Sequence, residues 1–147
     1  MAFVARASCL LAIPREVAFD RLADHDSWAA WMPASFRPVG KPAGRLSEGV
    51  KLRVKISGTP FPVSIRLSIV RRPEEICWCG GIKGVLYAEH RFSFEPREGA
   101  SVEVRSEEAW SGFLAAMLRS GILPKAERIG RDQLGALAAA VEPKPLV

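Results

Sequence analysis

Residues 111–141 read SGFLAAMLRSGILPKAERIGRDQLGALAAAV, and this stretch decides the fold. Apolar and small residues recur in it at helical spacing, and charged residues occupy the opposite side. The apolar side comprises Leu114, Leu118, Ile122, Ala126, Ile129, Ala136, Leu137 and Ala140. The charged side carries Arg119, Glu127, Arg128, Arg131 and Asp132. A continuous helix of this length spans roughly 40–45 Å, so we expect it to lie across a whole sheet.

Pro124 interrupts this helical pattern, because its ring would clash with the carbonyl of Ser120 in a continuous helix. Gly121 is also suited to ending a helix. Two outcomes stay open: the helix kinks at Gly121–Pro124, or residues 111–120 form a separate turn and the main helix begins near Leu123. The break is the outcome we favour.

The chain before this stretch reads as strands separated by turns, and Val63–Ile69 alternates most clearly. Short connections predict an antiparallel meander. Two short helices are expected between the first two strands, the second carrying Trp28 and Trp31 as core anchors. The expected strands are 3–13, 35–40, 50–57, 63–71, 75–80, 85–95 and 101–110. We therefore predict a single α+β domain over 1–147, with helices on one face of a curved seven-stranded sheet.

Composition limits the class of protein. Hydrophobic residues make up 48% of the chain and charged residues 25%, as in soluble globular proteins. No apolar run approaches the roughly 20 residues that cross a bilayer, and residues 1–13 lack the features of a signal peptide. We expect a cytoplasmic protein with no membrane insertion.

The cysteines and the basic residues indicate no special chemistry. Cys77 and Cys79 share one face of a strand without a further Cys or His cluster, so we expect free thiols and no metal. The net charge is +5, but the local concentration at Lys51, Arg53 and Lys55 alternates with apolar residues. Such alternation is typical of a strand with one solvated face, so we expect no nucleic-acid partner.

Period-two alternation assigns a face to each side chain of the last two strands. His90 and Phe92 share the inward face of 85–95, because the opposite choice would bury Glu89 and Arg91. If the hairpin turns at 96–100, His90 and the inward Glu108 lie at the same level on adjacent strands. The pair fits three interpretations: structural pairing, ligand contact, or acid–base catalysis. His25, by contrast, is expected at the surface.

The common catalytic motifs are missing from the chain. It contains no G-x-S-x-G, no H-E-x-x-H, no G-x-G-x-x-G before a helix, and no Walker loop.

The order of elements resembles the START-like superfamily, also called SRPBCC, and in particular its small bacterial polyketide cyclase/dehydrase-like proteins. The resemblance covers essentially the whole chain. It is carried by Pro14-Arg15-Glu16-Val17, Asp24…Trp28…Trp31-Met32-Pro33, Gly84…Glu89-His90-Arg91-Phe92-Ser93-Phe94-Glu95-Pro96 and Glu107-Glu108…Gly112-Phe113-Leu114. It implies a helix-grip fold, in which the sheet clasps the C-terminal helix around an apolar cavity. Members bind lipids, sterols, polyketides or plant hormones, and some are cyclases or stimulate the Hsp90 chaperone.

The resemblance and the inward residues together predict a binding protein for a small hydrophobic molecule such as a lipid, polyketide or aromatic metabolite, without a cofactor. Alternatives are a metal-free cyclase- or hydrolase-type enzyme using His90 or Glu108, and a chaperone-stimulating adaptor. The chain is expected to be a monomer or homodimer. The expected ligand-contacting residues are Val54, Ile65, Leu67, Trp78, Leu86, His90, Phe92, Ser106, Glu108, Trp110, Leu114, Leu118 and Ile122.

Overall fold

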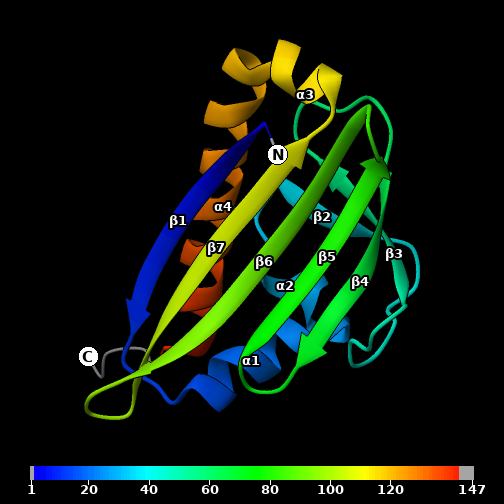
Figure 1. The fold of residues 1–147 in the computed structure, drawn as a ribbon. Helices are drawn as coiled ribbons and strands as arrows, with labels where there is room; N and C mark the ends of the chain where they lie inside the picture. The colour runs from blue at the N-terminus through cyan, green and yellow to red at the C-terminus, as the bar shows by residue number, and fades with distance from the viewer. Residues whose placement is uncertain (1, 143–147) are drawn as a thin grey trace.

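Seven antiparallel strands form one curved sheet in the computed structural model, which describes residues 2–142 (Figure 1). The spatial order is β1-β7-β6-β5-β4-β3-β2, so the chain forms a meander from β2 to β7 and β1 pairs with the last strand. The strands are β1 (Phe3–Leu11), β2 (Phe36–Val39), β3 (Lys51–Ile56), β4 (Val63–Arg71), β5 (Glu75–Ile82), β6 (Leu86–Arg97) and β7 (Ser101–Ser111). All seven predicted strands are confirmed, with ends that differ by at most two residues.

The helices cover the concave side of this sheet. The long α4 (Arg119–Val141) contacts β1 and β7, and Figure 1 shows it passing behind these two strands. Between β1 and β2 lie α1 (Arg15–Ala23), the 3-10 turn η1 (His25–Ser27) and α2 (Trp28–Trp31). The short α3 (Phe113–Met117) connects β7 to α4. The predicted α+β architecture, with helices gathered on one face, is confirmed.

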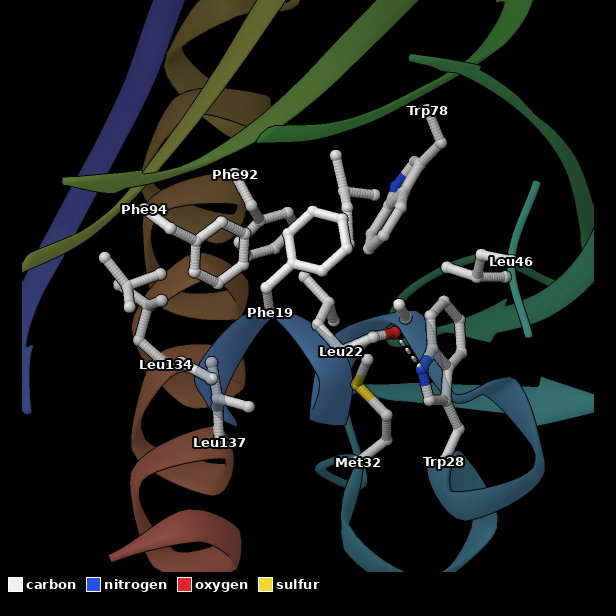
Figure 2. Packing of buried hydrophobic residues seen from close by; sticks show 14 of the residues in the cluster. Phe19, Leu22, Trp28, Met32, Leu46, Trp78, Phe92, Phe94, Leu134 and Leu137 are labelled. Carbon is white, nitrogen blue, oxygen red and sulfur yellow. Dashed lines mark hydrogen bonds between the residues drawn. The ribbon is translucent and has the colours of Figure 1, made fainter. Parts of the chain in front are cut away.

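Side chains from α1, α2, α4 and the sheet fill the space between the helices and the sheet. Phe19 packs edge-on against Phe94 with ring centroids 5.4 Å apart, and Trp28 lies 5.5 Å from Trp78 (Figure 2). Trp28 is fully buried and donates its indole N–H to the carbonyl of Leu22 over 2.9 Å. This confirms the prediction that Trp28 anchors the second short helix to the core.

The terminal helix breaks earlier than predicted. Residues 113–117 do form a separate segment, but the junction is Leu118, whose φ of −100° and ψ of 13° depart from helical geometry. α4 then runs through Gly121 and Pro124, so the prediction of a start near Leu123 is wrong. Pro124 has no backbone N–H, so it removes one helical bond to the carbonyl of Ser120, which is an exposed residue.

The inward face of α4 differs in part from the predicted one. Ala126 and Leu137 are buried as expected, whereas Leu118 is 50% exposed and its predicted inward position is wrong. The structure buries Gly130, Gln133 and Leu134 instead. These residues are spaced three or four apart with Ala126 and Leu137, so together they form one buried stripe along α4.

Candidate functional site

A buried pair of polar side chains lies on the concave face where β6 meets β7. His90 and Glu108 are directly opposite each other in the β6–β7 ladder, as the alternation predicted. His90 Nδ1 lies 3.2 Å from Glu108 Oε2, and His90 is only 4% exposed. Trp78 packs edge-on against the imidazole from β5, and Phe92 stacks on it from one side. The ring orientation is therefore held by both hydrogen bonding and packing.

Ser106 extends this pair into a chain of three groups. Its Oγ lies 2.7 Å from His90 Nε2, and the residue is buried. A carboxylate only accepts hydrogen bonds, so the 3.2 Å contact with Glu108 favours the tautomer with the proton on His90 Nδ1. In the neutral imidazole, Nε2 is then the acceptor and the Ser106 hydroxyl donates to it.

The second oxygen of Glu108 is bonded as well. Trp110 donates its indole N–H to Glu108 Oε1 over 2.8 Å, and the Trp110 ring stacks on Phe3 of β1. The carboxylate is thus fixed between an indole and an imidazole. Glu108 and Trp110 are partly exposed, so this end of the network lies nearer the surface than Ser106.

α4 comes close to the network at Gly130. A Cβ built on Gly130 would lie 3.2 Å from Ser106 Oγ and 3.7 Å from the Ala7 side chain. Small residues on α4 and β1 therefore surround the serine hydroxyl. Their small size lets the helix backbone come close to the strand that carries Ser106.

Gln133 is a polar residue on the inward face of α4 that the sequence analysis missed. It is 2% exposed, and neither its Nε2 nor its Oε1 has a hydrogen-bond partner among residues 2–142. Gln133 follows Gly130 by three residues, so the two lie on the same inward face of α4. Its helical spacing with Ala126, Gly130 and Leu137 could have indicated that Gln133 lies on the buried face.

His25 also lies elsewhere than predicted. It is buried rather than at the surface, because the loop after β2 covers it and its ring packs edge-on against Trp28. His25 Nδ1 accepts a hydrogen bond from the backbone N–H of Ala43 over 2.8 Å. Burial lowers the pKa of His25, so the neutral ring is favoured.

The other side chains expected to contact a ligand divide into groups by burial. One group is buried within the core: Val54, Ile65, Leu67, Trp78 and Phe92. Another is half-buried: Leu86, Trp110, Leu114 and Ile122. Two surface hollows, of about 360 Å³ at β3–β6 and about 380 Å³ at α3–α4, are lined by other residues apart from Ile65. Between the sheet and α4, buried hydrophobic side chains form one cluster that fills the interior in this conformation.

The cysteines and the basic strand lie outside the polar network. Cys9, Cys77 and Cys79 are free thiols, and burial raises the pKa of Cys9 to about 11. The described residues contain no cluster of three or more metal-ligating side chains. Lys51, Arg53 and Lys55 are exposed on the outer face of β3, which confirms the solvated face. Over residues 2–142, every helix is too short or too polar to span a bilayer.

Comparison with solved structures identifies the architecture. A protein from Helicobacter pylori, jhp0584, superposes with a TM-score of 0.74 at 16% identity, over 97% of this chain and 89% of the other. Protein CV1439 from Chromobacterium violaceum gives 0.66 at 19% identity, over 98% and 100%. The fold is a helix-grip fold.

A third structural neighbour has a documented genetic context. DynU16, a protein of the dynemicin biosynthetic locus, superposes with a TM-score of 0.68 at 14% identity, over 92% of this chain and 46% of DynU16. No protein-family model matches the chain, and neither does any curated protein. At these identities the likeness shows the fold alone.

Proposed function

We propose that the protein binds a small, largely apolar molecule between the concave face of the sheet and α4. The ligand would carry a polar group at the end nearest His90, Ser106 and Gln133. The cyclase-like resemblance and the DynU16 neighbour support polyketide-like or aromatic molecules as the ligand class.

The unpaired amide of Gln133 is the observation that carries this proposal. A buried polar group without a partner costs about 1–3 kcal/mol, and protein cores seldom contain one. A ligand group that both donates and accepts, such as an amide, a carboxylic acid or a hydroxyketone, would satisfy both atoms. Apolar pockets with a few placed polar groups are the usual form of small-molecule sites.

Ligand entry needs the interior to open, because aromatic side chains fill it in this conformation. Leu114 and Ile122, two half-buried residues expected to contact the ligand, lie on either side of the junction at Leu118. Movement of α3 about this junction and Gly112 would uncover the interior without breaking the sheet. Binding then selects the open conformation over the closed one.

Two measurements test binding. Native mass spectrometry of the protein purified from its own host, compared with the denatured mass, would show a retained small molecule. A titration monitored by tryptophan fluorescence would compare 2-naphthamide with its hydrocarbon analogue 2-isopropylnaphthalene. We expect saturable binding, with the amide favoured about tenfold through its two hydrogen bonds.

Variants locate the binding site. Gln133→Leu should remove the preference for 2-naphthamide and leave 2-isopropylnaphthalene binding intact. Enlarging Phe92 to Trp should weaken both probes, since it fills the same interior. Failure of both probes to bind above background, together with a clean apo mass, would refute the proposal.

An adaptor role is a second candidate, favoured by apolar side chains exposed on α3. Phe113 and Met117 are 58% and 73% exposed and adjoin the exposed Leu118. Exposed apolar clusters of this kind mark contact surfaces. If the adaptor role holds, the chain stimulates ATP hydrolysis by Hsp90, and a Phe113→Ser, Met117→Ser double variant does not.

A further inference from the structure

We propose that Ser106, His90 and Glu108 form a nucleophile, base and orienting carboxylate that cleave a carboxylic ester in the bound molecule. This inference rests on the proposed function, because Ser106 is reached only by a molecule inside the closed interior. Such triads are recognised by geometry and not by position in the sequence. The absence of a G-x-S-x-G motif therefore does not exclude one.

The distances fit the three roles. Ser106 Oγ and His90 Nε2 are 2.7 Å apart, and His90 Nδ1 and Glu108 Oε2 are 3.2 Å apart. Nucleophile and base must lie about 2.6–3.2 Å apart, with the base oriented by a third group. The Glu108 carboxylate favours the tautomer in which Nε2 is free to take a proton from the serine.

The sheet holds these three groups rigidly. Ser106 and Glu108 are two residues apart on β7 and share its concave face, and His90 faces them from β6. Trp110 fixes the other carboxylate oxygen, and Trp78 and Phe92 hold the imidazole. The additional serine on the free nitrogen completes the order that acyl transfer requires.

Gln133 supplies the remaining requirement, a donor for the oxyanion. Its Nε2 is buried and unpaired, and Gln133 follows Gly130, the residue of α4 that approaches Ser106 Oγ, by one helical turn on the same inward face. A preorganised donor in an apolar, water-poor site stabilises developing negative charge more strongly than it would in water. The stability that the unpaired amide costs is then explained by its role in the reaction.

The proposed reaction is hydrolysis of an ester by water. Ser106 Oγ attacks the carbonyl carbon while His90 Nε2 takes the serine proton, and the Gln133 amide donates to the carbonyl oxygen. The tetrahedral intermediate collapses, the C–O bond breaks, and the leaving alcohol takes the proton from His90. Water then attacks the acyl-serine with His90 as base, which releases the carboxylic acid and restores the Ser106 hydroxyl.

The test combines covalent labelling with turnover. The wild-type protein is incubated with an alkyl fluorophosphonate, which forms a bond to an activated serine oxygen and releases fluoride. Intact mass gives the stoichiometry, and peptide mapping gives the position. Hydrolysis of p-nitrophenyl hexanoate is measured in parallel for wild type, Ser106→Ala, Glu108→Gln and the control Ser93→Ala, a serine on the outward side of β6.

We expect one label per chain, at Ser106, and hydrolysis that falls about 100-fold or more in Ser106→Ala and in Glu108→Gln. Ser93→Ala should retain wild-type hydrolysis. The Glu108→Gln variant keeps the carboxylate's shape but favours the wrong imidazole tautomer. It should also lose labelling at Ser106, an effect that a structural role alone would not produce.

Binding distinguishes failure of this inference from failure of the proposed function. If Ser106→Ala and Glu108→Gln bind 2-naphthamide as wild type does, loss of activity in them reflects chemistry and not unfolding. Labelling at other serines, or hydrolysis unchanged in Ser106→Ala, would overturn the triad while binding stands. Absence of probe binding in the wild type would overturn the proposed function itself.

Discussion

At the scale of single residues, the interior contains two kinds of polar group. One kind is a network in which three contacts of 2.7–3.2 Å pair the polar atoms of His90, Ser106, Glu108 and Trp110 with one another. The Gln133 amide has no such partner among the described residues. A satisfied network is compatible with stability, whereas an unpaired buried amide lowers it. Replacing a paired group by an apolar one should therefore lower the free energy of unfolding, whereas replacing the unpaired amide should raise it.

Replacing Gln133 with Leu should stabilise the protein without ligand. The substitution removes two unpaired polar atoms at nearly constant volume, so the free energy of unfolding should rise by about 1–3 kcal/mol. Urea denaturation of wild type and variant measures the difference. A decrease in stability would show that the amide is hydrogen-bonded in solution and would remove the main support for a ligand at this position.

His25 should make stability depend on pH. Burial lowers its pKa below the unfolded value near 6.5, so the neutral ring stabilises the fold. This contribution is present above pH 6.5 and is lost as the pH falls below it, because the unfolded state then binds a proton more readily. His25→Gln should therefore lose less unfolding free energy than wild type between pH 7 and pH 5 in parallel urea titrations. Equal losses would contradict this.

At the scale of elements, α4 is adapted to the sheet by its glycines. Gly130 lies where the helix meets Ser106, whereas a Cβ at Gly121 or Gly135 would meet no atom within 4 Å. Glycine in a helix interior costs about 0.5–1 kcal/mol relative to alanine. Close packing against Ser106 explains the glycine at position 130. Nothing in the structure explains the glycines at positions 121 and 135.

Substitutions at these glycines of α4 should have opposite effects on the free energy of unfolding. Gly135→Ala should raise the free energy of unfolding by about 0.5–1 kcal/mol through helix propensity. Gly130→Val should lower it by about 1–3 kcal/mol, because the added side chain overpacks the contact with Ser106 and Ala7. Thermal or urea unfolding measures both. A stabilised Gly130→Val variant would mean that α4 lies farther from β7 than the structure places it.

At the scale of the whole molecule, the sheet is continuous and the helical layer is divided. The β6–β7 ladder runs over eleven residue pairs, from Tyr87–Ser111 to Arg97–Ser101. The helical layer is interrupted at Leu118, beside the exposed α3. Segments with few buried contacts open at lower free energy than core strands. Because the helical layer is interrupted at Leu118, we expect the interior to open there and not through the sheet.

Hydrogen exchange should reveal this opening. Amides of residues 113–123 should exchange faster than those of β6 and β7, and a saturating interior ligand such as 2-naphthamide should slow the faster group. Exchange measured by mass spectrometry with and without the probe checks both statements. Uniform protection of 113–123 and β7 would place the entry route elsewhere.

Much of the fold was predictable from the sequence because strand alternation is local and its period is two. Once Glu89 and Arg91 are assigned to the solvent-exposed face of β6, the alternation determines which residues of this strand face inward. The short hairpin turn then sets the register of β6 with β7. His90 and Glu108 were therefore found as neighbours before the structure. The separate segment before α4 was likewise predicted from Pro124 and Gly121, although its end was misplaced.

Tertiary structure alone decided which polar groups became buried. His25 is buried because the loop after β2 covers it, and Gln133 because α4 presses on β1 and β7 at Gly130. The contact of Ser106 with His90 depends on side-chain rotation across two strands, and the closed interior depends on aromatic rings from five elements. These are contacts between residues distant in the chain. Local periodicity carries no information about them, because it specifies a face but not what that face meets.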